Sequence, residues 1–293
     1  MLQQSAFTLV NKQNGNLAFK LFSFEDNSHF DHIQRNNYFS LIWVKEGAGV
    51  LKADFSEYHF ESNSLFAFSP YQPYMFAEST NIKGIAIYFH PEFFCIYKHD
   101  REVSCNGVLY NNIYNPPFVS VDDKSANTFQ LLCEQIKTEM QNTELAQYEL
   151  LVSYLKIFLI TASRLKVQQH QDVFDEKQTD KEPFILQKLK DAIEAHFKTK
   201  HAPSDYAEML YITPKALAKI TKSHFNKTLS SIINERIIIE AKRELYLTNK
   251  TVKQIAYELG YDDEYYFSRF FKVNAEVSPQ IYRETVGYAK AMG

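Results

Sequence analysis

Residues 236–272 read RIIIEAKRELYLTNKTVKQIAYELGYDDEYYFSRFFK, and this stretch predicts three successive helices. A long apolar helix is expected over 229–247, because isoleucine and leucine recur along it at helical spacing. Thr251 and Gln254 have the spacing of a capping box, which predicts the start of a short second helix. Gly260 is free to adopt a positive φ and is expected to end that helix. A short helix, a tight turn and a further helix together indicate a helix-turn-helix unit.

The same pattern occurs earlier in the chain, over residues 204–225. Thr213 and Pro214 supply a capping residue followed by a proline at the first helical position. The helix after them reads PKALAKITKSHF, with its lysines projecting outward. Asp262 is expected to cap the later helix, so the two second helices start 49 residues apart. A single such pattern can be a plain helical hairpin with a solvated lysine face, whereas two joined by one long helix are far more specific.

Rings and polar residues are interleaved in the last predicted helix. Phe267 and Phe271 lie four residues apart and are expected to form the core of a small domain. The polar residues fall on other faces, where an arginine can pair bidentately with guanine and serine or lysine can hold phosphate. Asp263 and Glu264 suit a helix N-terminus or can accept a hydrogen bond from cytosine, with surface solvation as the alternative. This face therefore predicts contact with double-stranded DNA.

The stretch 236–272, followed by SPQIYR at 278–283, resembles the signature of the AraC/XylS family of bacterial transcription regulators. The resemblance covers roughly residues 184–285 and implies two recognition helices that read adjacent major-groove segments. It also implies a regulator, more often an activator than a repressor, with RNA polymerase as a partner. The residues expected to contact DNA in the first recognition helix are Lys215, Ala218, Lys219 and Lys222. Those expected in the second are Glu264, Tyr265, Ser268, Arg269 and Lys272.

Two positions depart from the family pattern. Where the family often has glycine after each recognition helix, this chain has Asn226 and Glu276. Asparagine tolerates a left-handed conformation but glutamate tolerates it poorly, so we expect the second turn to differ. Ala218 offers no hydrogen bond, so we expect the first helix to rely on lysine contacts with phosphate.

Charge is distributed unevenly along the chain. The net charge is −3 over 293 residues, but residues 183–293 carry 17 Lys and Arg against 13 Asp and Glu, and residues 1–182 carry 15 against 22. The three cysteines have no CxxC spacing, which favours reduced thiols over a disulfide or a zinc site. No secretory signal or membrane-spanning run is evident, so a cytoplasmic protein is expected.

Short aromatic and β-branched runs between residues 37 and 90 predict a β-sandwich or small barrel. The stretch FSLIWVKEGAGVLKADFSEYHFESNSLFAFSPYQPYMF at 39–76 resembles the cupin-like sensor domain attached to many such regulators, over roughly 15–95. The expected fold is therefore two-domain α+β: a cupin-like β-barrel with following helices, then an all-α domain. The expected boundaries are 1–165, a polar linker at 166–182, and 183–293.

Cupins can also be metal enzymes, which makes an enzyme the rival hypothesis for the N-terminal part. Such a site needs several histidines pointing inward, but His29 and His32 are three residues apart and would face opposite sides of a strand. His59 and His90 stand alone, and Tyr74 occupies the place of a later histidine. No metal, cofactor or catalytic residue is therefore expected.

A small-molecule cavity can use rings with polar tips. Residues of this kind on or beside the predicted strands are Arg35, Tyr38, Trp43, Tyr74 and Tyr88. The alternative is that they belong to the core or pack against helices. The expected protein is a transcription regulator controlled by a small-molecule effector. A constitutive regulator whose N-terminal domain binds only proteins is the other possibility.

Two apolar helices are predicted after the strands, over 126–141 and 145–165. A face of the second helix must pack on the barrel, form a homodimer seam, or do both. Leu155 lies between Tyr154 and Lys156, residues with polar ends, and is expected to be the most seam-like position.

Overall fold

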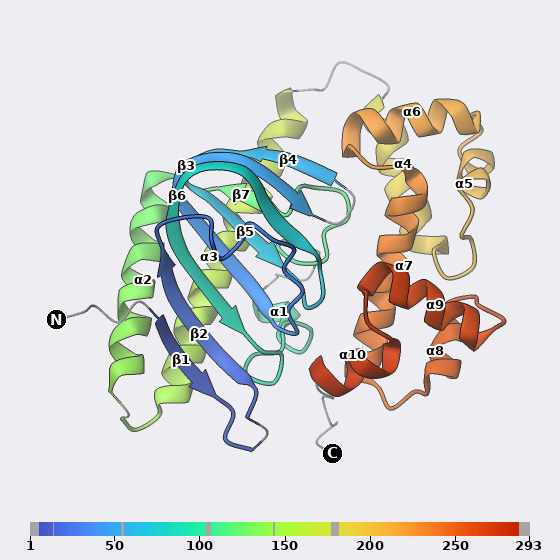
Figure 1. Cartoon of the computed structure of the whole chain (residues 1–293). Helices are drawn as coiled ribbons and strands as arrows, with labels where there is room; N and C mark the ends of the chain where they lie inside the picture. Colours follow the sequence, from blue (N-terminus) through green and yellow to red (C-terminus); the bar gives the residue numbers. More distant parts are fainter. Residues whose placement is uncertain are drawn as a thin grey trace. The chain divides into compact units, whose positions relative to one another are not determined.

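A computed structural model describes residues 6–13, 15–53, 56–103, 107–142, 144–176 and 182–286 (Figure 1). The chain divides into two compact units, residues 1–112 with 116–170 and residues 113–115 with 171–293. Helix α3 (Gln147–Glu176) runs through the first part of the stretch expected to be a linker. That part is therefore helical, and Leu165 immediately before it is buried. Residues 177–181 lie outside the described residues.

The first unit is built on one antiparallel sheet in the order β1-β2-β6-β3-β5-β7, with β4 paired to β3. Its strands are β1 (Ala6–Val10), β2 (Leu17–Phe24), β3 (Phe39–Ala53), β4 (Ser56–Phe60), β5 (Ser64–Phe68), β6 (Tyr74–Phe89) and β7 (Phe118–Ser120). The helices of this unit are α1 (Asp100–Val103), α2 (Asp123–Gln141) and α3. Strands β1 and β2 precede the predicted strands and were not expected.

The structure has two long strands where the sequence predicted four short ones. The runs at 37–44 and 49–55 belong to β3, and those at 74–78 and 84–90 belong to β6. The turn-like residues between them lie at register shifts of the β3–β6 pair, between Val44 and Val50. Gly47 has a φ of 100°, and a Cβ there would lie 2.6 Å from the carbonyl oxygen of Thr80. This glycine therefore permits a close backbone approach inside a ladder rather than a turn between strands.

Both faces of the sheet are buried, because successive side chains of β3 enter different cores. Leu41 and Trp43 join the core against α2 and α3, whereas Ile42 and Val44 join an aromatic-rich core on the other face. Figure 1 shows α2 and α3 lying side by side along the sheet. The second core is filled mainly by phenylalanine rings, such as Phe66 and Phe76 with centroids 4.9 Å apart.

The expectation for Leu155 is wrong. Leu151, Leu155 and Leu159 are all fully buried in the core between the sheet and the helices, and Phe158 stacks on Phe129 at 4.2 Å. Packing against the sheet is thus one role of this helix. Its exposed apolar side chains are at other positions, Leu150 (37% exposed) and Ile157 (48%).

The remaining expectations about the first unit concern absences. No helix in the described ranges is long and apolar enough to cross a membrane. No group of three His, Cys, Asp or Glu side chains in this described part of the chain could hold a metal ion. Cys95 and Cys133 are buried and free of disulfides, and Cys105 lies outside the described residues.

The second unit is helical in all of its described elements. They are α4 (Glu182–His196), α5 (Pro203–Met209), α6 (Pro214–Phe225), α7 (Leu229–Leu247), α8 (Val252–Glu258), α9 (Glu264–Ala275) and α10 (Pro279–Val286). Helix α7 supplies buried residues along its length, including Ile233, Ile237 and Leu245. The shorter helices α6, α8, α9 and α10 each contact it. The predicted long helix is therefore the scaffold that carries two helix–turn–helix units.

Candidate nucleic-acid interface

The first helix–turn–helix unit, here the first motif, consists of α5, the turn at 210–213 and α6. Ala207 is buried and small enough for the two helices to approach closely. Thr213 caps α6, because its side-chain oxygen accepts a hydrogen bond from the amide of Ala216 at 3.2 Å. Leu217 and Thr221 face the core, so the opposite side of α6 is left for solvent. This local arrangement matches the sequence prediction.

The exposed side of α6 carries the residues expected to contact DNA. Lys215, Ala218, Lys219 and Lys222 are all exposed, and their three- and four-residue spacing places them on one face. Lys215 and Lys219 make no hydrogen bond or ion pair with other residues of the described chain. The Lys222 ammonium donates to the carbonyl oxygen of Asn226 at 3.2 Å, near the C-terminal end of the helix. The face is cationic and contains one residue, Ala218, that cannot read a base by hydrogen bonding.

The second helix–turn–helix unit, the second motif, consists of α8, the turn at 259–263 and α9. Thr251 and Gln254 form the predicted capping box. Gly260 has a φ of 79°, and a Cβ there would lie 2.2 Å from the carbonyl oxygen of Lys198, so glycine is required. The cap of α9 is Asp263, whose carboxylate accepts from the amide of Tyr265 at 2.9 Å. The expected cap Asp262 is thus one residue too early.

Helix α9 separates its rings from its polar residues as predicted. Phe267 and Phe271 are fully buried. The residues expected to contact DNA lie away from this core: Glu264 and Ser268 are half-buried, and Tyr265, Arg269 and Lys272 are exposed. Arg269 makes no hydrogen bond or ion pair with any other described residue. Its guanidinium is therefore free to form a bidentate pair with a ligand.

Several other cations of the second unit are engaged by acids or by main-chain carbonyls. Arg236 pairs with Glu194 at 2.8 Å and Glu240 at 3.2 Å. Arg243 also pairs with Glu240, at 3.1 Å. The guanidinium of Arg283 donates to the carbonyl oxygen of Leu245 at 3.0 Å, which fixes α10 to the scaffold helix. These three arginines are held by the fold, in contrast to Lys215 and Lys219 of α6 and Arg269 of α9.

The two motifs also meet directly. The His201 ring, which precedes α5, lies 4.9 Å from the ring of Tyr261 in the second turn. The carbonyl of Lys198 contacts Gly260, as noted, so residues 198–201, which lead into the first motif, pack on the turn of the second. Their spacing is therefore fixed by this contact as well as by α7.

The residues after the recognition helices adopt the same conformation in both motifs. Asn226 has a φ of 54° and Glu276 a φ of 61°, both left-handed. The expected difference at Glu276 is therefore absent: the helix end imposes its geometry on a residue that tolerates it poorly.

Comparisons with known proteins agree with this geometry. A family model described as a helix-turn-helix domain matches residues 206–285, which include most of the first motif and all of the second. The HTH-type transcriptional activator Btr of Bacillus subtilis is 35% identical over 84 residues, or 29% of this chain and 16% of that protein. The raffinose operon regulatory protein RafR of Pediococcus pentosaceus is 27% identical over 32% of this chain and 34% of its own length. The C-terminal helix-turn-helix domain is therefore of the AraC type.

The similarity is concentrated in the C-terminal part. The chain spans about a third or less of the length of these curated relatives, which are named as transcription regulators. A solved structure of ToxT from Vibrio cholerae covers 93% of this chain, with 17% identity and a TM-score of 0.41.

In the first unit, three of the expected ligand residues lie together. The rings of Tyr38 and Tyr88 stack at 4.7 Å, and the Tyr74 hydroxyl donates to Ser40 at 3.4 Å. Burial raises the pKa of each of these three tyrosines, so their hydroxyls stay protonated and can donate. Tyr74 and Tyr88 are almost fully buried, and Tyr38 is half-buried.

The other two expected ligand residues lie elsewhere or point outward. Arg35 is exposed. Trp43 lies on the opposite face of the sheet, 5.9 Å from the Phe129 ring of α2 and with the Lys45 ammonium 4.5 Å from its own ring. Neighbouring positions in a strand point to opposite faces, so ring type alone could not decide which face Trp43 occupies.

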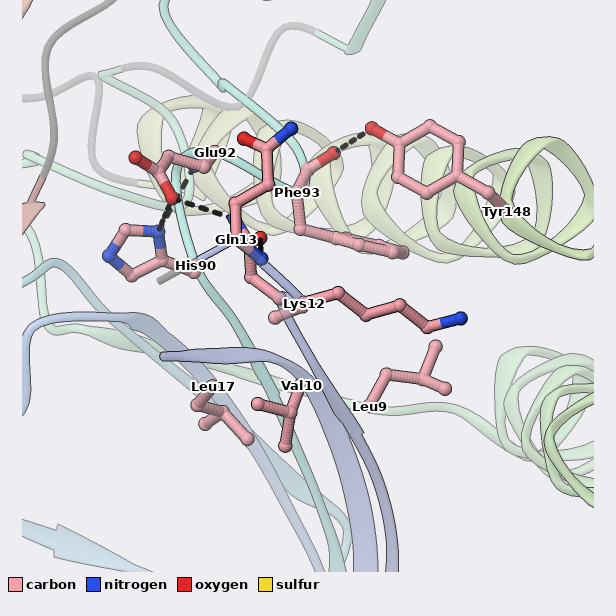
Figure 2. Close-up of a pocket in the computed structure, with 11 residues that line it drawn as sticks. Leu9, Val10, Lys12, Gln13, Leu17, His90, Glu92, Phe93 and Tyr148 are labelled. Carbon is pink, nitrogen blue, oxygen red and sulfur yellow. Dashed lines mark hydrogen bonds and ion pairs between the residues drawn. The ribbon is translucent and has the colours of Figure 1, made fainter. Parts of the chain in front are cut away.

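A pocket of about 440 Å³ lies at the β1–β2 hairpin (Figure 2). Its apolar walls include Leu9, Val10 and Phe93, and the Tyr148 hydroxyl of α3 donates to the carbonyl oxygen of Phe93 at 2.6 Å. Figure 2 shows the Lys12 side chain running across the space between Phe93 and Leu9. This pocket could not be predicted from the sequence pattern, because strands β1 and β2 were not expected.

Polar residues form one end of the same pocket. The Asn11 amide donates to the Glu92 carboxylate at 3.2 Å, and the same oxygen lies 3.7 Å from Nδ1 of the buried His90. Lys12 has no hydrogen bond or ion pair within the described part of the chain. The pocket therefore combines an apolar body with one cation that has no partner.

Proposed function

We propose that this protein is a sequence-specific transcription regulator that binds double-stranded DNA through α6 and α9. The observation that carries the proposal is the distribution of its cations. Arg269, Lys215 and Lys219 have no partner among the described residues, whereas Arg236 and Arg243 are held by acids. Unpaired cations on two exposed helix faces suit a polyanion, and fixed motif spacing suits two adjacent major-groove segments.

The two helices are proposed to have different tasks. Helix α6 presents lysines and Ala218, which favours phosphate contacts and little base reading. Helix α9 presents Arg269 and Ser268 beside the carboxylate of Glu264, groups that can discriminate between base edges. Sequence preference is therefore expected to come mainly from the second motif.

The test is binding by the full chain to DNA recovered from a randomised library. Arg269→Ala should weaken binding to the selected sequence by about 1–3 kcal/mol and relax preference at one base position. Arg243→Ala is the matched control, because this arginine is 44% exposed but paired with Glu240. Equal losses in both variants, measured by fluorescence anisotropy at one salt concentration, would contradict the placement of α9 in the groove.

We further infer that the first unit is a cupin-like sensor whose effector binds in the hairpin pocket. A small molecule with an apolar body and an anionic end fits the walls and the unpartnered Lys12. The probe is 1-anilinonaphthalene-8-sulfonate, whose fluorescence rises in apolar sites. Val10→Trp, which narrows the mouth, and Lys12→Glu should each reduce saturable fluorescence. Unchanged binding in both variants would favour a unit that senses no ligand at this pocket and instead contacts proteins.

The remaining parts of the proposal concern assembly and place of action. The regulator acts in the cytoplasm as a homodimer and activates transcription through RNA polymerase. Transcription in a reconstituted system with a selected operator upstream of a promoter tests activation directly. A decrease in transcript on adding the protein would assign repression instead.

A further inference from the structure

Tyr211 occupies an unusual position in the turn of the first motif. Its φ is 54°, and its side chain is 96% exposed. A positive φ costs a bulky residue free energy because the Cβ approaches the carbonyl oxygen, and glycine avoids this cost. The chain thus holds a large side chain in a strained conformation while burying almost none of it.

The second motif shows how the same turn is made without this cost. Gly260 is the left-handed residue there, with a φ of 79°. In the first motif the turn is closed by main-chain hydrogen bonds, from the Tyr211 amide to Glu208 at 3.0 Å and from the Ile212 amide to Ala207 at 3.1 Å. Any residue that adopts this φ can make these bonds, so they do not require a tyrosine side chain.

No contact within the described residues offsets the strain either. The Tyr211 hydroxyl and ring form no hydrogen bond or ring contact there. Strain that the fold does not use points to a role outside the fold.

The place of Tyr211 in the motif identifies that role. It lies two residues before Thr213, the cap of α6, and Thr213, Pro214 and Lys215 are all exposed. When the N-terminal part of a recognition helix enters the major groove, the turn before it comes close to the sugar–phosphate backbone. A phenol can donate to a phosphate oxygen there, and its ring can cover a deoxyribose.

We propose that Tyr211 is a DNA-backbone contact that positions the first recognition helix, and that its backbone strain is retained for this contact. The inference rests on the proposed DNA-binding function. Tyr211 thus gives the first motif an uncharged contact with the DNA backbone, beside the contacts of its lysines. Because phosphates are the same in every sequence, the contact adds affinity without base preference.

Tyr211→Gly tests the proposal, since it relieves the strain and removes the side chain together. The full-chain variant should melt at the same temperature as the wild type or higher, yet bind DNA about tenfold more weakly. The loss should be the same for selected and unrelated sequences. Tyr211→Phe should show an intermediate loss, because the ring remains and the phosphate hydrogen bond is gone.

Glu276→Gly is the matched control, because it relieves left-handed strain at an exposed residue after the other recognition helix. It should leave affinity within twofold of the wild type. If the wild type binds DNA and Tyr211→Gly binds it with the same affinity, the role of Tyr211 alone is overturned. An equal loss in Glu276→Gly would also overturn it, by assigning the effect to backbone flexibility. Failure of the wild type to bind any DNA would refute the proposed function as well.

Discussion

Glu276 ends α9 in the left-handed conformation that Asn226 adopts at the end of α6, with φ values of 61° and 54°. Asparagine visits this region readily, whereas glutamate does so only when the surrounding structure requires it. The second motif thus keeps its geometry at a local cost in stability that the first motif largely avoids.

Glu276→Gly should therefore stabilise the protein. Relief of the strained φ outweighs the greater flexibility of glycine in the unfolded chain, with a net gain of about 0.5–1 kcal/mol. Urea unfolding followed by far-ultraviolet circular dichroism measures the change. Asn226→Gly should change stability by a few tenths of a kcal/mol at most, and a larger gain there than at Glu276 would contradict this explanation.

Local signals in the sequence were sufficient to predict the second unit. The capping box of Thr251 with Gln254, the proline after Thr213 and the required Gly260 are each decided within a few residues. The one-residue error at Asp262 arose because two adjacent aspartates are equally suited to capping, and only the geometry of the turn selects Asp263.

The first unit could be predicted less well because its contacts are distant in sequence. Gly47 resembles a turn residue until the approach of Thr80 is known. Helix α3 has apolar residues on most of its faces, so periodicity alone could not show that Leu155 faces the sheet and Ile157 faces solvent. The pocket at the β1–β2 hairpin depends on two strands that carry no strong sequence pattern.

The next prediction concerns the salt dependence of DNA binding. Lys219→Ala should weaken binding to all sequences and reduce the slope of log K against log salt by about 0.9, the value for one lost phosphate contact on duplex DNA. Lys250→Ala is the control, because this ammonium is held by Glu244 at 2.8 Å and by Glu258 at 2.6 Å. Anisotropy titrations at several salt concentrations give the slopes. An unaltered slope in Lys219→Ala would remove α6 from the phosphate-contacting surface.

The buried side chain of Lys166 is expected to make the protein more stable as the pH rises above 7. It is 2% exposed, its ammonium donates to the carbonyl oxygen of Pro116 at 2.8 Å, and burial lowers its pKa to about 7. In the unfolded chain a lysine has a pKa of about 10.4. The free-energy cost of burying the Lys166 ammonium is therefore paid in full below pH 7, and it disappears as the pH rises toward 10.

Lys166→Met should therefore stabilise the protein by about 2–4 kcal/mol at pH 7, with the lost hydrogen bond reducing the gain. The advantage should shrink steadily between pH 7 and pH 10. Urea unfolding of variant and wild type across this range measures the difference. Lys52→Met, at a lysine whose side chain is 46% exposed, should show no such trend. A difference that does not vary with pH would mean that Lys166 is not neutralised by folding.

The last prediction separates the two faces of α3. Leu155 is fully buried against the sheet, whereas Ile157 is 48% exposed on the same helix. Leu155→Glu buries an unpaired carboxylate and should unfold the first unit. Ile157→Glu should leave the monomer folded and, if this face forms the proposed homodimer seam, should separate the subunits. Operator binding should then weaken, because two linked DNA-binding domains gain affinity from their effective concentration. Light scattering and thermal melting of both variants distinguish the outcomes. A folded Ile157→Glu protein with the same mass as the wild type would place any dimer contact elsewhere.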